Sequence, residues 1–177
     1  MSASPELPLQ CSIAYNTHGG YCVPLSSRHR PAAQKILAGQ VYEPQTIDFI
    51  TRHAASGDII HAGTYFGDFL PALSRACAPG CQVWACEPNP ESHRCATITC
   101  LINGLENVTL TNAALGERAE SRLLLTTNRE GRGLGGASQL LPPSAADIAG
   151  RTAAVSMITV DELVPPDRPV SILQLDV

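Results

Sequence analysis

This 177-residue sequence is poor in charge and contains no long apolar segment. Charged residues make up 16% of the chain, against about 25% in an average soluble domain. The formal net charge is −4 and Lys and Arg form no cluster, so the chain offers no basic face to nucleic-acid phosphates. No stretch approaches the roughly 18 consecutive apolar residues that a membrane-spanning helix requires. These absences disfavour both nucleic acid and membrane as partners.

The first residues also lack the pattern of a secretory signal. Residues 1–10 include Pro5, Glu6 and Pro8, and no basic start precedes an apolar run. The sequence therefore predicts a cytoplasmic protein.

The seven cysteines form no C-x-x-C pair. Zinc sites usually use tighter paired spacing, whereas Cys86, Cys95 and Cys100 fall in segments with the pattern of a strand or a helix. We therefore expect small buried thiols and no metal site.

Apolar runs alternate with helical patterns from residue 58 onward. Strands are predicted at 58–62, 82–86 and 108–111, and helical spacing of apolar residues follows each of the first two. Strands that alternate with helices of about 10–15 residues indicate parallel βαβ units. The sequence therefore predicts an α/β protein with a Rossmann-like sheet over 57–177, preceded by a hairpin and helices over 1–56. The second of these helices is expected to begin at Pro44 and to stop at Gly57.

The alternation of strands and helices breaks after residue 120. Two further strands are predicted at 122–126 and 153–160 with no helix between them, so we expect an inserted β-hairpin. The intervening segment is rich in Gly, Ser, Ala and Pro, which indicates a flexible flap. Its part from Gly131 to Gly136 lacks the flanking elements and the G-K-[ST] of a phosphate loop, although Ser138 could face a substrate.

The last apolar run, 170–175, has the character of a strand from the middle of a sheet. Domains seldom stop at such a strand, because one of its edges would stay unpaired. The sheet is therefore expected to be truncated after its fourth parallel strand, as the N-terminal portion of a longer domain. An exposed strand edge would also favour pairing between copies, which makes a homo-oligomer one expectation.

The segment 58–89 carries most of the functional information. Gly63 and Gly67 flank the turn after the first strand, where glycine lets the backbone approach a ligand closely. Glu87 ends the next strand, 20 residues beyond Gly67, which is the interval expected of a nucleoside-binding βαβ unit. An acid at that place can accept hydrogen bonds from the hydroxyls of a ribose. The sequence therefore predicts that these three residues converge on an adenosine-containing cofactor.

The turn favours one kind of cofactor over another. It reads G-x-x-x-G, without the middle glycine of a dinucleotide fingerprint, and Tyr65 and Phe66 are bulky for a phosphate cradle. A ligand without phosphate, such as S-adenosylmethionine, suits such a turn better. A nicotinamide-dependent oxidoreductase is the alternative enzyme class, and a tight turn that binds no ligand is the simplest alternative.

Several neighbours of the turn join the candidate cofactor-binding residues. Thr64, Tyr65 and Asp68 belong to the turn region, and Asp68 is also expected to cap the following helix. Pro88 follows the ribose acid. For His61, at the end of the first strand, a packed or hydrogen-bonded histidine is the favoured interpretation and a cofactor contact the alternative.

Two later strand ends complete the candidate site. Asn112 and Ala113 follow the third strand, where small residues would leave room for an adenine ring that Asn112 could hydrogen-bond, although an ordinary turn explains them nearly as well. Asp176 ends the last strand at the same sheet edge. A carboxylate there could orient a substrate, act as a catalytic base or hold a cation.

The order of these segments resembles the FkbM-type family of S-adenosylmethionine-dependent methyltransferases. The resemblance spans about 57–177 and rests on five pieces, at 59–67, 83–90, 107–116, 157–163 and 172–177. The more specific pieces are Glu87-Pro88-Asn89-Pro90 and the last strand with its aspartate.

The resemblance implies a class I methyltransferase sheet and transfer of a methyl group from S-adenosylmethionine to a hydroxyl of a sugar, polyketide or similar small molecule. It implies that Gly63 and Gly67 lie at the cofactor turn and that Glu87 holds the ribose. The chain departs from the family at His61, where the family usually has Asp, and the family continues beyond Val177 with further strands and helices. A degenerate or truncated nucleoside-binding module without catalysis is the non-enzyme alternative.

Overall fold

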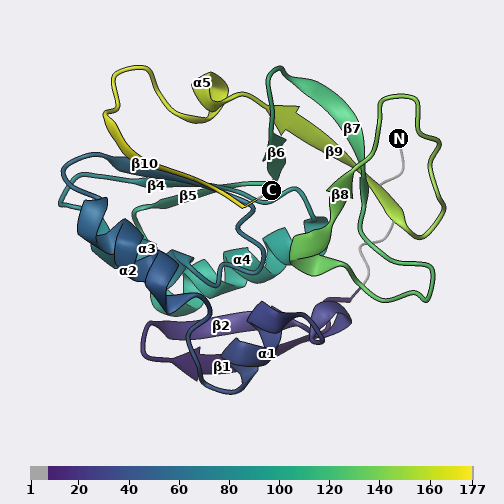
Figure 1. Cartoon of the computed structure of the whole chain (residues 1–177), viewed down its shortest axis with the longest axis horizontal. Helices are drawn as coiled ribbons and strands as arrows, with labels where there is room; N and C mark the ends of the chain where they lie inside the picture. Colours follow the sequence, from purple (N-terminus) through teal and green to yellow (C-terminus); the bar gives the residue numbers. More distant parts are fainter. Residues whose placement is uncertain (1–7, 177) are drawn as a thin grey trace.

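The computed structural model describes residues 8–176 and is built around a parallel sheet (Figure 1). Its strands are β3 (Asp58–Ala62), β4 (Val83–Cys86), β5 (Val108–Thr111) and β10 (Val170–Leu175), in the order β10-β3-β4-β5. All three pairings are parallel. The predicted α/β class is confirmed, and a parallel sheet with helices packed on it is typical of Rossmann-like folds.

Three helices cover one face of this sheet, namely α2 (Pro44–His53), α3 (Leu70–Ala76) and α4 (Pro90–Asn103) (Figure 1). Each has a proline in its first turn, where the missing N–H costs no helical hydrogen bond. Asn89 caps α4 by accepting from the N–H groups of Glu91 and Ser92, and Gly104 ends it in the left-handed conformation. The helices bury Ile47, Ile50, Leu70 and Leu73 against β3 and β4.

Two predicted helix boundaries are wrong. Helix α3 begins at Leu70, so Asp68 does not cap it; the capping position is Phe69, which makes no side-chain cap hydrogen bond. The reason is a chain of tight turns, in which Gly67 N–H donates to Thr64 O and Leu70 N–H donates to Gly67 O before the helix starts. Helix α2 ends at His53, before the predicted stop at Gly57.

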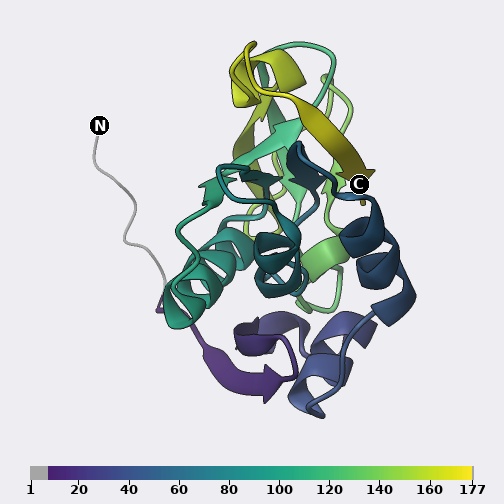
Figure 2. The ribbon, with the colours of Figure 1, turned by 90° about the vertical axis from the view of Figure 1, so that its left-hand side faces the viewer.

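The N-terminal extension packs beyond these helices, at the end of the molecule opposite α5 (Val160–Leu163) (Figure 2). It consists of the predicted hairpin, β1 (Cys11–Asn16) and β2 (Gly19–Pro24), followed by η1 (Leu25–Ser27) and α1 (Pro31–Leu37). Thr99 of α4 accepts from Cys22 N–H at 3.0 Å and donates to Phe66 O at 2.9 Å. One hydroxyl thus connects the extension, α4 and the glycine turn.

A second sheet stands at the end of the parallel one. It contains β6 (Ala113–Leu115), β7 (Glu120–Leu125), β8 (Gln139–Leu140) and β9 (Thr152–Ile158), in the order β6-β9-β7-β8, and η2 (Gly135–Ala137) lies in its long loop. The antiparallel pair β7–β9 confirms the inserted hairpin. The turn considered at Ala113 is wrong, because 113–115 pairs in parallel with β9, a partner more than 40 residues away.

Strand β10 lies at the edge of the parallel sheet and has β3 as its one neighbour among residues 8–176. Among these residues its other edge is unpaired, as the sequence predicted for this strand. The side chains of Leu173 and Leu175 are each 54% exposed, while Ile172 packs into the core under α2 and α3. The apolar run thus combines one buried face with one open face.

Within residues 8–176, no helix is both long and apolar enough to cross a membrane. The seven cysteines, all of which are described, form no disulfide. No three His, Cys, Asp or Glu side chains gather as metal ligands in that part of the chain.

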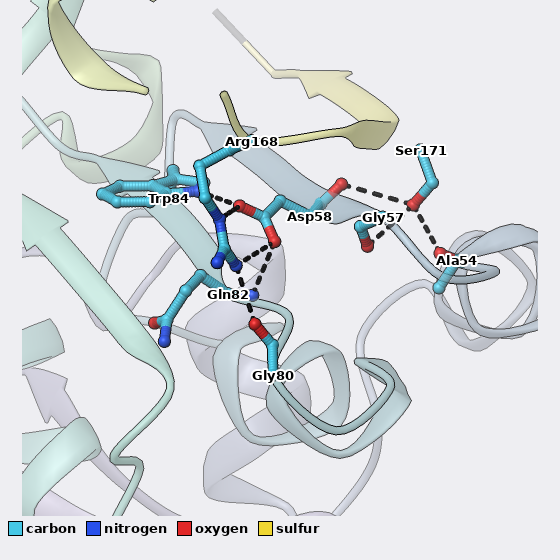
Figure 3. Close-up of polar contacts among 8 residues, drawn as sticks. All are labelled: Ala54, Gly57, Asp58, Gly80, Gln82, Trp84, Arg168 and Ser171. Carbon is cyan, nitrogen blue, oxygen red and sulfur yellow. Dashed lines mark hydrogen bonds and ion pairs between the residues drawn. The ribbon is translucent and has the colours of Figure 1, made fainter. Parts of the chain in front are cut away.

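The parallel strands all begin at one end of the sheet, which we call its amino edge. The buried carboxylate of Asp58, the first residue of β3, holds this end together (Figure 3). It is fully buried and accepts two hydrogen bonds from Arg168, at 2.6 and 2.8 Å, one from Trp84 Nε1 at 2.7 Å and one from Gln82 N–H at 2.9 Å. Burial alone would raise the pKa of Asp58, but these donors outweigh it and the pKa is lowered. The loop that leads into β10 is thereby fastened to β3 and β4.

We expect Arg168→Met to lower the free energy of unfolding by more than the matched control below, because it leaves the buried Asp58 carboxylate without its cation. Urea denaturation followed by circular dichroism measures the change. The matched control is Arg52→Met, which removes an exposed ion pair with Asp48 and should cost less than about 1 kcal/mol. Equal effects of the two substitutions would contradict this account of the amino edge.

Candidate functional site

The carboxyl ends of parallel strands share one sheet edge, and two adjoining cavities lie at that edge of this sheet. The first has a volume of about 360 Å³ and is bounded by the ends of β4 and β6 and by the insert, with Glu87, Ala113 and Leu140 in its wall. The second, of about 200 Å³, is bounded by the glycine turn and the N-terminal extension. Gly63, Gly136 and Asp176 line both, so the cavities meet there.

Glu87 points into the glycine turn, as the sequence predicted. Its Oε2 accepts from Tyr65 N–H at 2.6 Å and its Oε1 accepts from Asn89 N–H at 2.8 Å, while the residue is only 4% exposed. Each carboxylate oxygen has two lone pairs, so each can accept one further hydrogen bond. The side chain therefore fastens the turn to the end of β4 and still lines the first cavity.

Charge at this edge is poorly compensated. Burial raises the pKa of Glu87 to about 8, with Asp68 adding to the effect and the N–H groups of Asn89 and Tyr65 opposing it. Burial also raises the pKa of Asp68 to about 7, and the charges of Asp176 and Glu43 act in the same direction. The pKa of Asp176 is raised by burial and by Glu43. A cation bound here would relieve this repulsion.

The turn from Gly63 to Gly67 is rigid because the chain itself fills its surroundings. Gly63 has φ +80°, and a Cβ there would overlap the carbonyl oxygen of Asp176. Gly67 has φ +82° and packs closely on Thr99 of α4. Thr64 is fully buried and donates to His61 O at 3.2 Å. Thus Gly63 lines the cavities, whereas Thr64 and Gly67 support the turn from within.

Tyr65 fastens the insert and the extension to the turn. Its hydroxyl lies 2.6 Å from Ser27 Oγ, and its ring lies so close to Gly135 that a Cβ there would be 2.6 Å from the hydroxyl. Tyr65 lines the second cavity, and Phe66 packs in the core beneath the extension, so neither side chain fills the first cavity.

The glycine-rich part of the insert is tethered to its surroundings. Gly133 N–H donates to Ser26 O at 3.2 Å and Leu134 N–H donates to Thr126 O at 2.7 Å. Ser138 accepts from Asn89 Nδ2 at 2.9 Å and donates to Gly135 O at 2.7 Å, and it lines the first cavity. The segment therefore forms a wall of the site.

Of the remaining candidate cofactor-binding residues, two line the first cavity and one holds the backbone beside it. Pro88 and Ala113 line the first cavity. Asn112 comes to the same edge, but its amide donates to the carbonyls of Glu87 at 2.7 Å and Pro88 at 3.3 Å, where it holds the end of β4.

His61 is a packed residue that also lines the second cavity. Its ring stacks on Phe69 with centroids 5.6 Å apart, and its Nδ1 is hydrogen-bonded to Gln174 Oε1. Burial lowers its pKa to about 4, against the effect of Gln174, so the ring is neutral at physiological pH. Its Nε2 is buried and has no hydrogen-bond partner.

Sequence reasoning missed several wall residues. Arg30 and Tyr42 line the second cavity, and Leu124, Leu140 and Gly136 line the first. Arg30 and Tyr42 lie just ahead of Pro31 and Pro44, which begin helices. These prolines indicate helix starts in the sequence, but nothing in the local sequence indicates a cavity. The sequence showed a cluster of glycines in the insert. Their position in the cavity wall follows only from the packing of Gly135 and Gly136 on Tyr65.

The sequence model of the methyltransferase FkbM domain matches residues 61–177, more than half of the chain. This protein belongs to the FkbM methyltransferase family. The match begins at His61 and includes the glycine turn, Glu87 and Asp176. No curated protein matches the chain.

Solved methyltransferases align with parts of this FkbM-family chain. A SAM-dependent methyltransferase from Aquifex aeolicus is 20% identical over 48% of this chain and 42% of its own, with a TM-score of 0.38. A putative O-methyltransferase from Klebsiella pneumoniae is 21% identical over 42% of this chain and 35% of its own, with a TM-score of 0.37. A SAM-dependent methyltransferase from Agrobacterium tumefaciens is 9% identical over 62% of this chain and 34% of its own, with a TM-score of 0.42. The chain thus spans less than half the length of these proteins.

We expect Gly63→Ala to destabilise the protein far more than Gly131→Ala. Both glycines have positive φ, +80° and +75°, so both substitutions carry a backbone cost of about 1–2 kcal/mol. Only at Gly63 does the new methyl group overlap Asp176, while Gly131 faces open space. Urea unfolding of the two variants separates the backbone cost, which both share, from the overlap with Asp176. Equal decreases in unfolding free energy would show that the chain does not pack tightly at Gly63.

We expect the unfolding free energy of the free protein to fall by about 3 kcal/mol between about pH 6.5 and 8.5. Asp68 and Glu87 have folded-state pKa values of about 7 and 8, raised from 3.8 and 4.5, so the folded state holds protons that the unfolded state has lost. Their stabilising contribution is complete below the unfolded pKa values and disappears as the pH rises through 7 and 8. Urea titrations at several pH values measure it.

Glu87→Gln should flatten this pH dependence, because it removes the group with the higher pKa. The control is Glu106→Gln, an exposed acid on the loop before β5, which should leave the dependence unchanged. If the unfolding free energy of Glu87→Gln varied with pH as steeply as that of the wild-type protein, other groups would be responsible for the pH dependence.

Proposed function

We propose that this chain binds S-adenosylmethionine at the carboxyl edge of its parallel sheet and serves the methylation of a hydroxyl oxygen on a small molecule. The observation that carries the proposal is the convergence of Glu87 and the glycine turn beside the first cavity, in a member of the FkbM methyltransferase family. The acceptor class, a sugar, polyketide or similar metabolite, follows the family resemblance.

The adenosine part of the cofactor fits the first cavity. The volume of about 360 Å³ lies within the range of about 300–1,000 Å³ that is usual for small-molecule sites. Glu87 would accept hydrogen bonds from the ribose hydroxyls with its free lone pairs, and Pro88, Ala113 and Leu140 would enclose the base. Asn112 and Ser138 support this wall through the end of β4 and the cap of α4.

The charge of the site favours S-adenosylmethionine over a dinucleotide. Glu87, Asp68 and Asp176 line the two cavities, and burial and neighbouring carboxylates raise the pKa of each, so a nearby positive charge would favour their ionised forms. A pyrophosphate would add like charge to this edge, whereas a sulfonium and an ammonium group would offset it. The acidic residues at this edge therefore disfavour the nicotinamide-dependent alternative, independently of the glycine pattern.

When bound, S-adenosylmethionine supplies an electrophilic methyl group on a positively charged sulfur. The chemistry that it would supply at this edge is transfer of that methyl group to the acceptor oxygen, with the electron pair of the carbon–sulfur bond left on sulfur, while Glu87 and the glycine turn would hold the nucleoside. In our proposal Asp176, which lies where the cavities meet, accepts the hydroxyl proton. Positioning of the two reactants can contribute about 7–11 kcal/mol and a general base about 10²–10⁴-fold in rate.

Isothermal titration calorimetry tests the cofactor assignment. We expect S-adenosylhomocysteine to bind and NAD⁺ not to bind. At pH 9, where Glu87 with its pKa of about 8 is ionised, Glu87→Gln should weaken S-adenosylhomocysteine binding about 10- to 100-fold, because hydrogen bonds to a charged group are worth about 1.5–3 kcal/mol. Glu106→Gln should bind like the wild-type protein. Binding of NAD⁺ without binding of S-adenosylhomocysteine would overturn the proposal, and binding of neither ligand would favour a degenerate module.

A further inference from the structure

Four arginines gather where the N-terminal extension meets the insert. A hydrogen bond of 3.2 Å from Gly133 N–H to Ser26 O holds the tip of the insert beside η1 (Figure 1). The arginines that lie near this contact along the chain are called the basic rim here, and they are Arg28, Arg30, Arg129 and Arg132. Lys and Arg form no cluster along the sequence, so only the fold brings the two pairs together.

The charge of the basic rim is not neutralised by the part of the chain that the structure describes. Among residues 8–176, no carboxylate lies within ion-pair distance of any of its four guanidinium groups. Two acids share the region: Glu91 accepts from the Ser26 hydroxyl, and Glu130 lies between the two arginines of the insert. The rim therefore carries excess positive charge in a chain whose net charge is −4.

Arg30 connects the basic rim to the second cavity, because it belongs to the wall of that cavity. It also lies close enough to Tyr65 to oppose the effect of burial, which raises the pKa of that residue. Asp68 and Asp176 line the same cavity. Asp68 is buried, whereas the other three arginines of the rim are exposed. Excess positive charge thus lies outside this cavity, and two carboxylates lie in its wall.

We propose that the basic rim binds an anionic group of the methyl acceptor, a phosphate or a carboxylate, while a hydroxyl of the same molecule reaches Asp176. A guanidinium group can donate two parallel hydrogen bonds to either anion. The carboxylates of the second cavity repel negative charge, so the anionic end stays at the rim and the neutral hydroxyl end enters. The inference rests on the proposed function and deepens it, because it assigns the acceptor to negatively charged hydroxy compounds.

The first measurement compares sugars that differ in charge. Glucose 6-phosphate and glucuronate carry the two kinds of anion, and glucose carries neither. In ¹⁵N NMR titrations at constant ionic strength and without phosphate buffer, at least one anionic sugar should shift the amide signals around Arg28 and Arg132 saturably, whereas glucose should leave them unchanged. Saturating S-adenosylhomocysteine should not displace the anionic sugar, because none of the rim arginines lines the first cavity, which takes the adenosine in our proposal.

The second measurement removes charge from the basic rim. The double variant Arg28→Gln/Arg132→Gln keeps Arg30 in the cavity wall and should weaken binding of the anionic sugar about 3- to 30-fold, because it loses two exposed charge-assisted contacts. The matched control is Arg52→Gln/Arg75→Gln, which changes the net charge equally at exposed positions of α2 and α3. The control should change the affinity by less than about 2-fold, because salt screens distant exposed charges.

The outcomes separate this inference from the proposed function. Binding of an anionic sugar that is weakened in the rim variant and not in the control supports the inference, and the sugar that binds identifies the anion. Absence of binding, equal weakening in both double variants, or displacement by S-adenosylhomocysteine overturns the inference while the cofactor assignment stands. Binding of a short oligothymidylate without binding of either anionic sugar overturns it in favour of nucleic acid. Failure of S-adenosylhomocysteine to bind the wild-type chain overturns the proposed function, and an anion bound at the rim would then not belong to a methyl acceptor.

Discussion

The site depends on the two hydrogen bonds that the side chain of Glu87 accepts. This side chain joins two backbone segments, the turn at Tyr65 and the start of α4 at Asn89, through one hydrogen bond from each oxygen. Its own backbone is held as well, because its N–H donates to Thr111 O and its C=O accepts from Asn112 Nδ2. A residue held on every side can present its remaining lone pairs in one fixed orientation, which is what recognition of a ribose requires.

The two edges of the parallel sheet use buried carboxylates in opposite ways. At the amino edge Asp58 meets a guanidinium, an indole N–H and a backbone N–H, and its pKa is lowered. At the carboxyl edge Glu87 and Asp68 are buried, no cation lies within ion-pair distance of either among residues 8–176, and their pKa values are raised. The first edge is satisfied within the chain and stabilises the fold, whereas the second has the perturbed pKa values that are common at functional sites.

Two further polar side chains lie at the carboxyl edge. His61 has one nitrogen bonded to Gln174 and one without a partner, and Arg30 lines the second cavity with no carboxylate within ion-pair distance among residues 8–176. The insert and the N-terminal extension close over these groups through Tyr65, which contacts both Ser27 and Gly135. The N-terminal extension and the insert thus enclose one set of incompletely satisfied polar groups. Such a set is characteristic of a binding site and would be costly in an ordinary core.

The sequence by itself determined the strands at 58–62, 108–111 and 170–175, a strand at 82–86 that in the structure begins one residue later, the hairpins, and the convergence of the glycine turn, Glu87 and Asp176 on one edge. These features follow from local patterns, and parallel strands necessarily bring their carboxyl ends together. Tertiary structure alone decided the pairing of β6 with β9, the packing of the insert on Tyr65, and the contacts of Asp58 with Arg168 and of His61 with Gln174. These last two contacts join residues 110 and 113 positions apart, and no local pattern of charge or hydrophobicity specifies which distant side chain a buried polar group will meet.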